Sequence, residues 1–241
     1  MSAAGSPEGA RPLPRGGSAR SGAAASLEEG IAPQDLDEGL AALAAAGIVL
    51  PPQAADKLAA FLALLVKWNR TYNLTAIRDP EQMITHHVLD ALSVLPHLPT
   101  RAVRVLDVGS GGGVPGLPLA IARPASTFVL LDASQKKGAF LQQAAIELGL
   151  GNVEAVTARV EDYAPAAPFD VVVSRAFSDL ATFARAGLRL LAPAGRLLAM
   201  KGALPSDEIA ALPPGVRVVA TPTIVVPGLD AARHLVVMEV A

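Results

Sequence analysis

Apolar positions recur at two different spacings along the chain and divide it into helices and strands. Spacings of three and four residues over 53–69, 80–92, 117–121, 135–148 and 180–191 predict amphipathic helices, and an alanine-rich segment over 36–46 predicts another. Short apolar runs at 103–108, 128–131, 153–156, 169–173 and 196–200 predict buried strands. Two more strands are expected near 216–226 and 234–240. Five β–α repeats closed by a terminal hairpin predict an α/β fold with a doubly wound, mostly parallel, seven-stranded sheet and an antiparallel edge strand.

Composition divides the chain further. Residues 1–30 are mainly Ala, Gly, Ser, Pro and Arg, with little to bury, and are predicted to be a disordered low-complexity tail. Residues 31–100 are predicted to be N-terminal helices that pack on the core. Residues 101–241 hold the strands of the sheet and are expected to form the main domain.

The chemistry is concentrated after the first strand. Asp107 ends that strand, and Gly109, Gly111 and Gly113 follow at alternate positions, where glycine permits positive φ and close approach of a ligand. A helix resumes after them, with Pro115 near its first turn. A strand, a glycine turn and a helix N-terminus form a nucleotide-binding element. We expect bare amides and the positive end of the helix to face the ligand.

The glycines fit two nucleotide classes. Gly111, Gly113 and Gly116 satisfy the Gly-x-Gly-x-x-Gly spacing of dinucleotide folds, but that pattern begins two residues late and contains Pro115. The acidic-x-Gly-x-Gly-x-Gly pattern on Asp107 fits better and resembles motif I of class I methyltransferases that use S-adenosylmethionine. Asp132 ends the next apolar run, where a carboxylate accepts hydrogen bonds from ribose hydroxyls under either interpretation. Further polar residues are expected at the carboxyl ends of later strands: Glu161, Arg175 and Lys201.

The amino-acid composition excludes several kinds of reaction and binding site. The absence of cysteine excludes disulfides, thiolate metal sites, cluster-based radical chemistry and a cysteine nucleophile. No apolar run reaches the roughly 20 residues needed to cross a bilayer, so a cytoplasmic protein with no membrane partner is expected. The net charge of −2 argues against a generally basic nucleic-acid binder, although residues 101–201 carry a small basic excess. His86 and His87 lack metal-ligand spacing, so packing or exposure is the plainer interpretation and no metal site is predicted.

Several motifs together resemble one bacterial family. They are Trp68-Asn69 with Tyr72-Asn73-Leu74-Thr75, Arg78-Asp79-Pro80, His87-Val88-Leu89-Asp90-Ala91-Leu92, residues 107–118, Val173-Ser174-Arg175-Ala176-Phe177 and Met200-Lys201-Gly202. The family is the ribosomal small-subunit RNA methyltransferase G family, also called glucose-inhibited division protein B. The resemblance runs from about residue 55 to the C-terminus and implies a Rossmann-like methyltransferase domain with an N-terminal helical extension.

The resemblance also implies an activity. It is transfer of a methyl group from S-adenosylmethionine to N7 of one guanine in 16S rRNA near the decoding centre, with 16S rRNA or the small ribosomal subunit as partner and a monomeric enzyme. With Asp107 and Gly111 from motif I, the cofactor residues it implies are Gly109, Val114, Asp132, Ala133, Ser134, Val160, Glu161 and Arg175. Guanine N7 has a free lone pair at neutral pH, so no general base is needed and no catalytic residue is assigned.

Contacts with RNA are a separate hypothesis. Arg123, Arg159, Arg175 and Lys201 are expected to contact phosphate or a flipped base. Alternatively, Arg159 and Arg175 merely pair with Glu161 or Asp162. Three other functions remain open: a small-molecule methyltransferase, a ribosome-assembly or cofactor-sensing factor without turnover, and a nicotinamide oxidoreductase.

Overall fold

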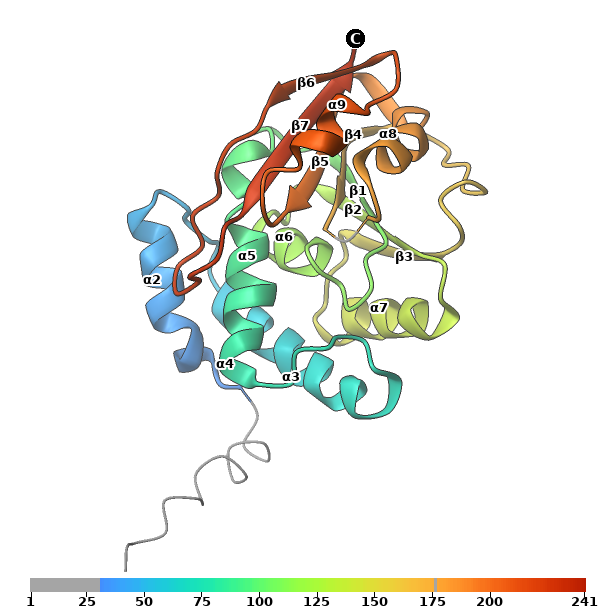
Figure 1. The fold of residues 1–241 in the computed structure, drawn as a ribbon. Coiled ribbons are helices and arrows are strands. Elements are labelled where there is room, and N and C mark those ends of the chain that lie inside the picture. Colours follow the sequence, from blue (N-terminus) through green and yellow to red (C-terminus); the bar gives the residue numbers. More distant parts are fainter. Residues whose placement is uncertain (1–30, 176) are drawn as a thin grey trace, which may run out of the picture. The chain divides into compact units, whose positions relative to one another are not determined.

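The computed structural model describes residues 31–175 and 177–241. These described residues form one compact unit. Its seven-stranded sheet has the order β3-β2-β1-β4-β5-β7-β6 (Figure 1). The strands are β1 (Arg104–Val108), β2 (Thr127–Asp132), β3 (Val153–Thr157), β4 (Phe169–Ser174), β5 (Leu191–Lys201), β6 (Val216–Ala220) and β7 (His234–Val240). β1 to β5 pair in parallel, and β7 is antiparallel to both β5 and β6. The predicted fold class is therefore confirmed. The predicted disordered tail, 1–30, lies outside the described residues.

Helices precede the sheet and alternate with its strands. Before β1 lie η1 (Pro33–Leu36), α2 (Asp37–Ala45), α3 (Ala54–Tyr72), α4 (Pro80–Met83), η2 (Ile84–Leu89), α5 (Asp90–Leu92) and η3 (Leu95–His97). Between and after the parallel strands lie α6 (Gly116–Ala122), α7 (Gln135–Glu147), α8 (Leu180–Leu188) and α9 (Ser206–Ala210). Asp79 caps α4 through the Glu81 amide, as its position before Pro80 predicts.

Successive residues of the central strands point to opposite faces of the sheet. Val105 belongs to a hydrophobic cluster with α3, η2, α6 and α7, whereas Leu106 belongs to a second cluster with α8. On β4, Val171 and Val172 divide in the same way. Both faces are covered, which explains why these strands are continuously apolar in the sequence. The N-terminal helices share the first cluster with the sheet, while the division of the chain at residue 100 stays a prediction.

Three elements differ from the sequence-based expectation. The expected helix over 80–92 is a single run whose middle, η2, is π-helical. β5 begins at Leu191, five residues before the expected strand, and a register shift against β4 accommodates the irregular start. A loop over 158–168 leads from β3 to β4, with no helix between them. The fold therefore has one β–α repeat fewer than the expected five. At the start of β5, pairing with β4 overrides the local sequence pattern.

Candidate cofactor and RNA site

The carboxyl ends of β1 and β4 meet at the centre of the sheet. From β1 the chain crosses over to β2 on one side, and from β4 it crosses over to β5 on the other. Such a reversal creates a crevice outside the carboxyl ends of the strands, where doubly wound sheets bind ligands. Asp107 on β1 pairs with Val173 on β4, two residues before Arg175. Asp132 at the tip of β2 lies one strand away.

The loop between β1 and α6 requires glycine at several positions. Gly109, Gly111 and Gly113 have φ values of +74°, +56° and +83°. A Cβ on Gly113 would lie 2.3 Å from Leu117 Cδ1, so both conformation and space exclude a side chain there. The Val114–Pro115 peptide bond is cis, and Val114 is buried.

Most amides of this loop are bonded within the protein. Gly109 and Ser110 both donate to the Leu131 carbonyl, and Gly113 and Val114 both donate to the Ser110 carbonyl. The first amide of α6, on Gly116, donates to Asp107 Oδ2 at 3.0 Å. The expectation that bare amides and the helix end face the ligand is therefore wrong for these positions. A pyrophosphate needs such free donors, so this geometry disfavours the dinucleotide interpretation.

Asp107 is a buried carboxylate beneath the loop. Its Oδ2 accepts the Gly116 amide, whereas its Oδ1 is buried without a hydrogen-bond partner among the described residues. Burial raises the pKa of the Asp107 carboxyl to about 7, against the opposing effects of the Gly116 amide and the Arg175 charge. An unpaired buried carboxylate oxygen costs free energy in the protein alone and favours a ligand that donates to it or carries positive charge.

Asp132 joins the tip of β2 to the glycine loop. Its Oδ2 accepts the Gly111 amide at 3.0 Å, and its Oδ1 accepts the Ser134 amide at 2.9 Å. Lys137 approaches the same carboxylate at 3.8 Å. A carboxylate has about four acceptor positions, so this one keeps capacity for further donors such as ribose hydroxyls. The neighbouring Ala133 is exposed.

The loop after β3 lies beside the tip of β2. The Ala158 amide donates to the Asp132 carbonyl at 3.2 Å. Val160 is buried, and its carbonyl accepts a hydrogen bond from the Arg189 guanidinium of the segment after α8. Glu161 is exposed and therefore free to turn toward a ligand at this edge.

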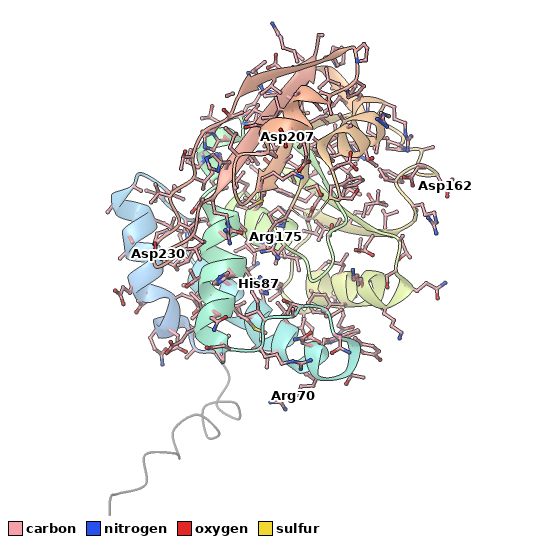
Figure 2. The ribbon with its side chains drawn as sticks, in the orientation of Figure 1. Arg70, His87, Asp162, Arg175, Asp207 and Asp230 are labelled. Carbon is pink, nitrogen blue, oxygen red and sulfur yellow. The ribbon has the colours of Figure 1, made fainter. Side chains whose placement is uncertain are left out.

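Arg175, at the tip of β4, contacts the N-terminal helices rather than the β3 loop. Its Nη1 donates to the His86 carbonyl at 2.6 Å, and both Nη atoms lie 3.4 Å from His87 Nδ1. Figure 2 labels Arg175 and His87. Its ion-pair partner is Asp90, at 3.6 Å. The alternative pairing with Glu161 or Asp162 is not formed among the contacts of the described residues. Burial lowers the pKa of the Arg175 guanidinium, against the charges of Asp90 and Asp107, but an arginine stays protonated.

His87 was not expected to matter, yet it is central to this contact. It is buried, and burial together with the Arg175 charge lowers its pKa to about 4, so the ring is neutral at pH 7. Its Nε2 lies 3.0 Å from Thr75 Oγ1. Asp90 was also not predicted, nor was Arg233, whose Nε lies 3.1 Å from Asp90 Oδ1. The sequence signal for His87 and Asp90 was the resemblance motif over 87–92, which gave no role to its individual residues, whereas Arg233 lies outside that motif.

The remaining basic candidates occupy different positions. Lys201, at the tip of β5, bonds to Glu208 at 2.8 Å, and the same carboxylate oxygen accepts the Leu180 amide. Arg159 is exposed on the loop after β3. Arg123 follows α6, which returns across the sheet, so it lies near the start of β2 at the opposite edge. The structure therefore does not bring Arg123 together with Arg175, and contact of these four residues with RNA stays a prediction.

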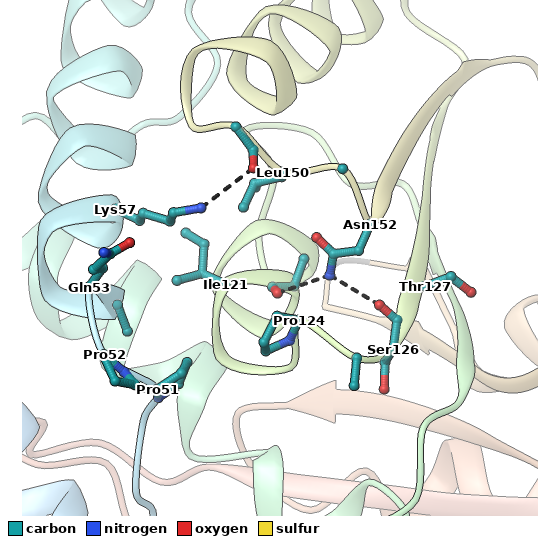
Figure 3. A pocket seen from close by; sticks show the side chains of 15 residues that line it. Pro51, Pro52, Gln53, Lys57, Ile121, Pro124, Ser126, Thr127, Leu150 and Asn152 are labelled. Carbon is teal, nitrogen blue, oxygen red and sulfur yellow. Dashed lines mark hydrogen bonds between the residues drawn. The ribbon is translucent and has the colours of Figure 1, made fainter.

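A cavity of about 500 Å³ opens at that opposite edge (Figure 3). Lys57 of α3 spans it toward the Gly149 carbonyl, and the Asn152 amide bonds to the carbonyls of Ala120 and Ser126. None of the expected cofactor residues lines it. Within 31–175 and 177–241, no cluster of three or more His, Asp or Glu side chains is arranged for a metal ion, and no helix is long and apolar enough to cross a membrane.

The sheet order, the acid near the end of β1, the glycine loop and the acid that ends β2 define a class I methyltransferase fold. A methyltransferase from Aquifex aeolicus described as dependent on S-adenosylmethionine has the same fold, with a TM-score of 0.51 at 18% identity over 70% of this chain and 97% of that one. Coclaurine N-methyltransferase matches with a TM-score of 0.50 at 14% identity over 80% of this chain and 74% of that one.

The family to which this chain belongs is shown by comparing its sequence with those of known proteins. The family model described as rRNA small subunit methyltransferase G matches residues 54–236. Ribosomal RNA small subunit methyltransferase G of Aromatoleum aromaticum is 53% identical over 208 residues, covering 85% of this chain and 97% of that protein. Its counterpart in Chromobacterium violaceum is 53% identical over 204 residues, covering 85% and 96%. The chain belongs to the rRNA small subunit methyltransferase G family, as its motifs predicted.

Proposed function

We propose that this protein transfers a methyl group from S-adenosylmethionine to N7 of a guanine in the RNA of the small ribosomal subunit. Membership of the family supports the reaction and its substrate class. The observation that carries the proposal is the pair of carboxylates at the switch point of the sheet. Asp132 holds the glycine loop with acceptor capacity to spare, and Asp107 keeps one buried oxygen unpaired.

The residues at this edge fit the methyl donor. Asp132 accepts ribose hydroxyls, while Gly109 and Gly111 allow close approach of the backbone. The others that would hold the group are Asp107, Val114, Ala133, Ser134, Val160, Glu161 and Arg175. When bound, S-adenosylmethionine supplies an electrophilic methyl group on a positively charged sulfur. The carboxylates of this edge suit a cation, which agrees with loop amides that are already bonded inside the protein.

The chemistry needs alignment more than proton transfer. Guanine N7 presents an in-plane lone pair that is unprotonated at neutral pH, so no base is required to expose it. Holding two reactants in line supplies up to about 7–11 kcal/mol of the barrier reduction. His87 is engaged by Thr75 and Arg175, in keeping with a reaction that uses no base. In the proposed complex, the Asp107 carboxyl and the Arg175 guanidinium lie near the methyl donor.

The RNA contacts form the less constrained part of the proposal. We infer that Arg175 and Arg159 contact RNA, which is supported by the position of Arg175 directly after β4 and by the exposure of Arg159 on the loop after β3. Lys201 meets RNA only if it exchanges its bond to Glu208. Action on ribosomal RNA implies a cytoplasmic site of action, and the monomeric state and a target near the decoding centre likewise stay predictions.

The test is methyl transfer to small ribosomal subunits from cells that lack this gene. We expect label from S-adenosylmethionine to enter 16S rRNA and to map to a single N7-methylguanine. Label in a free metabolite but not in RNA would instead favour a small-molecule methyltransferase. Tight binding of subunits without label would favour an assembly factor.

A further inference from the structure

Asp90 lies buried between two arginines that come from distant parts of the chain. Its Oδ2 is 3.6 Å from Arg175 Nη1, and its Oδ1 is 3.1 Å from Arg233 Nε. Arg175 immediately follows β4, and Arg233 immediately precedes β7. The carboxylate side chain is only 4% exposed, so this charged group joins the N-terminal helices to two elements of the sheet.

The π-helical segment η2 sets up this arrangement. The Asp90 amide bonds to the Thr85 carbonyl, five residues earlier, rather than to the His86 carbonyl. The His86 carbonyl accepts Arg175 Nη1. Single π-helical turns of this kind are frequent at functional sites. The extra residue in the turn therefore lets a backbone carbonyl and a carboxylate of one helix hold the same guanidinium.

A second chain of contacts fixes the guanidinium from the other side. His87 Nδ1 faces both Nη atoms of Arg175, and this nitrogen accepts a hydrogen bond only when the ring is neutral. The opposite ring nitrogen bonds to Thr75 Oγ1, and the Thr75 amide donates to Asn69 Oδ1 at 2.9 Å. Asn69 is itself buried at the end of α3. Arg175 is thus held by groups from η2 and α5, and Asn69 of α3 supports His87 through Thr75.

We propose that Asp90 and Arg233 are positioning residues for methyl transfer, acting through Arg175, whose guanidinium they hold at the tip of β4 beside Asp107. The inference rests on the proposed function and extends it to residues outside the cofactor and RNA set. Without Asp90, Arg175 keeps its hydrogen bonds to the helix but loses the charge that fixes it. Arg233 acts one step further away, by holding Asp90 in the orientation that faces Arg175.

A double-mutant cycle on methyl transfer tests this coupling. Asp90→Asn is expected to lower kcat about 10²-fold with little change in KM for subunits, because small misplacements of site groups cost this much. In an Arg175→Ala background, Asp90→Asn is expected to cost less than about twofold more. Arg196→Gln, which breaks an exposed ion pair with Glu239 on the same sheet, is the control and should leave kcat unchanged. Additive losses from Asp90→Asn and Arg175→Ala would overturn the inference.

Two further variants and one spectrum keep the inference testable if Asp90→Asn folds poorly. Arg233→Gln alters a side chain that is 22% exposed and should fold, lowering kcat in the same direction but less; unchanged kcat would count against the inference. The side-chain NMR resonance of the Arg175 Nη groups, which make its contacts with Asp90 and His86, is expected to shift toward that of a free arginine in Asp90→Asn or Arg233→Gln, but not in Arg196→Gln. An unchanged resonance would refute the positioning role even if the protein acts on another substrate. A wild-type protein that does not methylate rRNA would refute the proposed function instead.

Discussion

Asp132 Oδ2 accepts the backbone amide of Gly111 at 3.0 Å, which ties the tip of β2 to the glycine loop. One carboxylate thus shapes the loop and, in the proposed function, binds the ribose. Asp132→Ala is expected to weaken binding of S-adenosylhomocysteine about 10²-fold and to destabilise the protein by about 1–3 kcal/mol, because two amides lose their acceptor. Calorimetry and thermal unfolding measure the two effects. Asp230→Ala, at an exposed acid, is the control, and equal affinity in both variants would rule out the ribose role.

The Asp107 carboxylate is expected to destabilise the folded protein and to strengthen binding of S-adenosylmethionine. Asp107→Asn keeps an oxygen for the Gly116 amide and removes a buried charge, so we expect a protein about 2–4 kcal/mol more stable at pH 8. Its affinity for S-adenosylmethionine should fall about tenfold or more, because the cationic ligand loses a carboxylate. Urea unfolding and calorimetry at pH 8 test both parts. A variant that is less stable than wild type would show that the Asp107 charge is compensated within the protein.

The pH dependence of stability should reveal two buried groups that oppose each other. The pKa of Asp107 is raised to about 7, so its stabilising contribution is complete below pH 4 and disappears as pH rises to 7. The pKa of His87 is lowered to about 4, so its contribution is present above pH 6.5 and disappears as pH falls to 4. Relative to wild type, Asp107→Asn should gain stability with rising pH, and His87→Gln should lose it. Parallel curves for all three proteins would contradict these pKa shifts.

Gly116 makes room for both the sheet and the acid. A Cβ at this position would lie 2.2 Å from Leu130 Cδ2 and 2.7 Å from Asp107 Oδ2. Gly116→Ala is therefore expected to cost about 1–3 kcal/mol of stability and to weaken cofactor binding by displacing Asp107. Gly151 has open space around it and makes Gly151→Ala the matched control, with a change near zero. Denaturant midpoints decide the comparison, and equal midpoints would contradict the close packing at Gly116.

The Arg159 side chain is expected to contribute to the affinity for RNA but not to the affinity for the cofactor. It is exposed on the loop after β3, so Arg159→Ala is expected to raise KM for subunits several-fold at physiological salt while leaving S-adenosylhomocysteine affinity unchanged. Steady-state kinetics at two salt concentrations measure the effect. A KM insensitive to the substitution would remove Arg159 from the RNA site.

Much of this molecule could be predicted from its sequence, because the signals were local. The apolar runs gave the parallel strands, and Asp107 with its alternating glycines gave the loop and the class of fold. The hydrogen bonds of the loop amides were not predictable, because their partners, the Leu131 carbonyl and Asp132, are set by how β2 lies against β1. The free-amide expectation came from glycine spacing, which is shared with folds that bind phosphate.

The ion-pair partner of Arg175 could not be predicted from the sequence for a similar reason. Asp90 is 85 positions away in the sequence, and a π-helical turn that no periodicity marks orients it. Glu161 and Asp162 were nearer in sequence and chemically plausible, yet the chain turns them elsewhere. Arg123 was misplaced because a helix after a parallel strand carries its end to the opposite edge of the sheet.

The most direct measurement is a calorimetric titration of the folded protein with S-adenosylmethionine, repeated on Asp132→Ala and with NAD as a competing ligand. We predict one site for S-adenosylmethionine, binding weakened about 10²-fold by Asp132→Ala and no heat with NAD. Heat with NAD but none with S-adenosylmethionine, in a protein that unfolds cooperatively, would contradict the assignment of the carboxylate-lined edge.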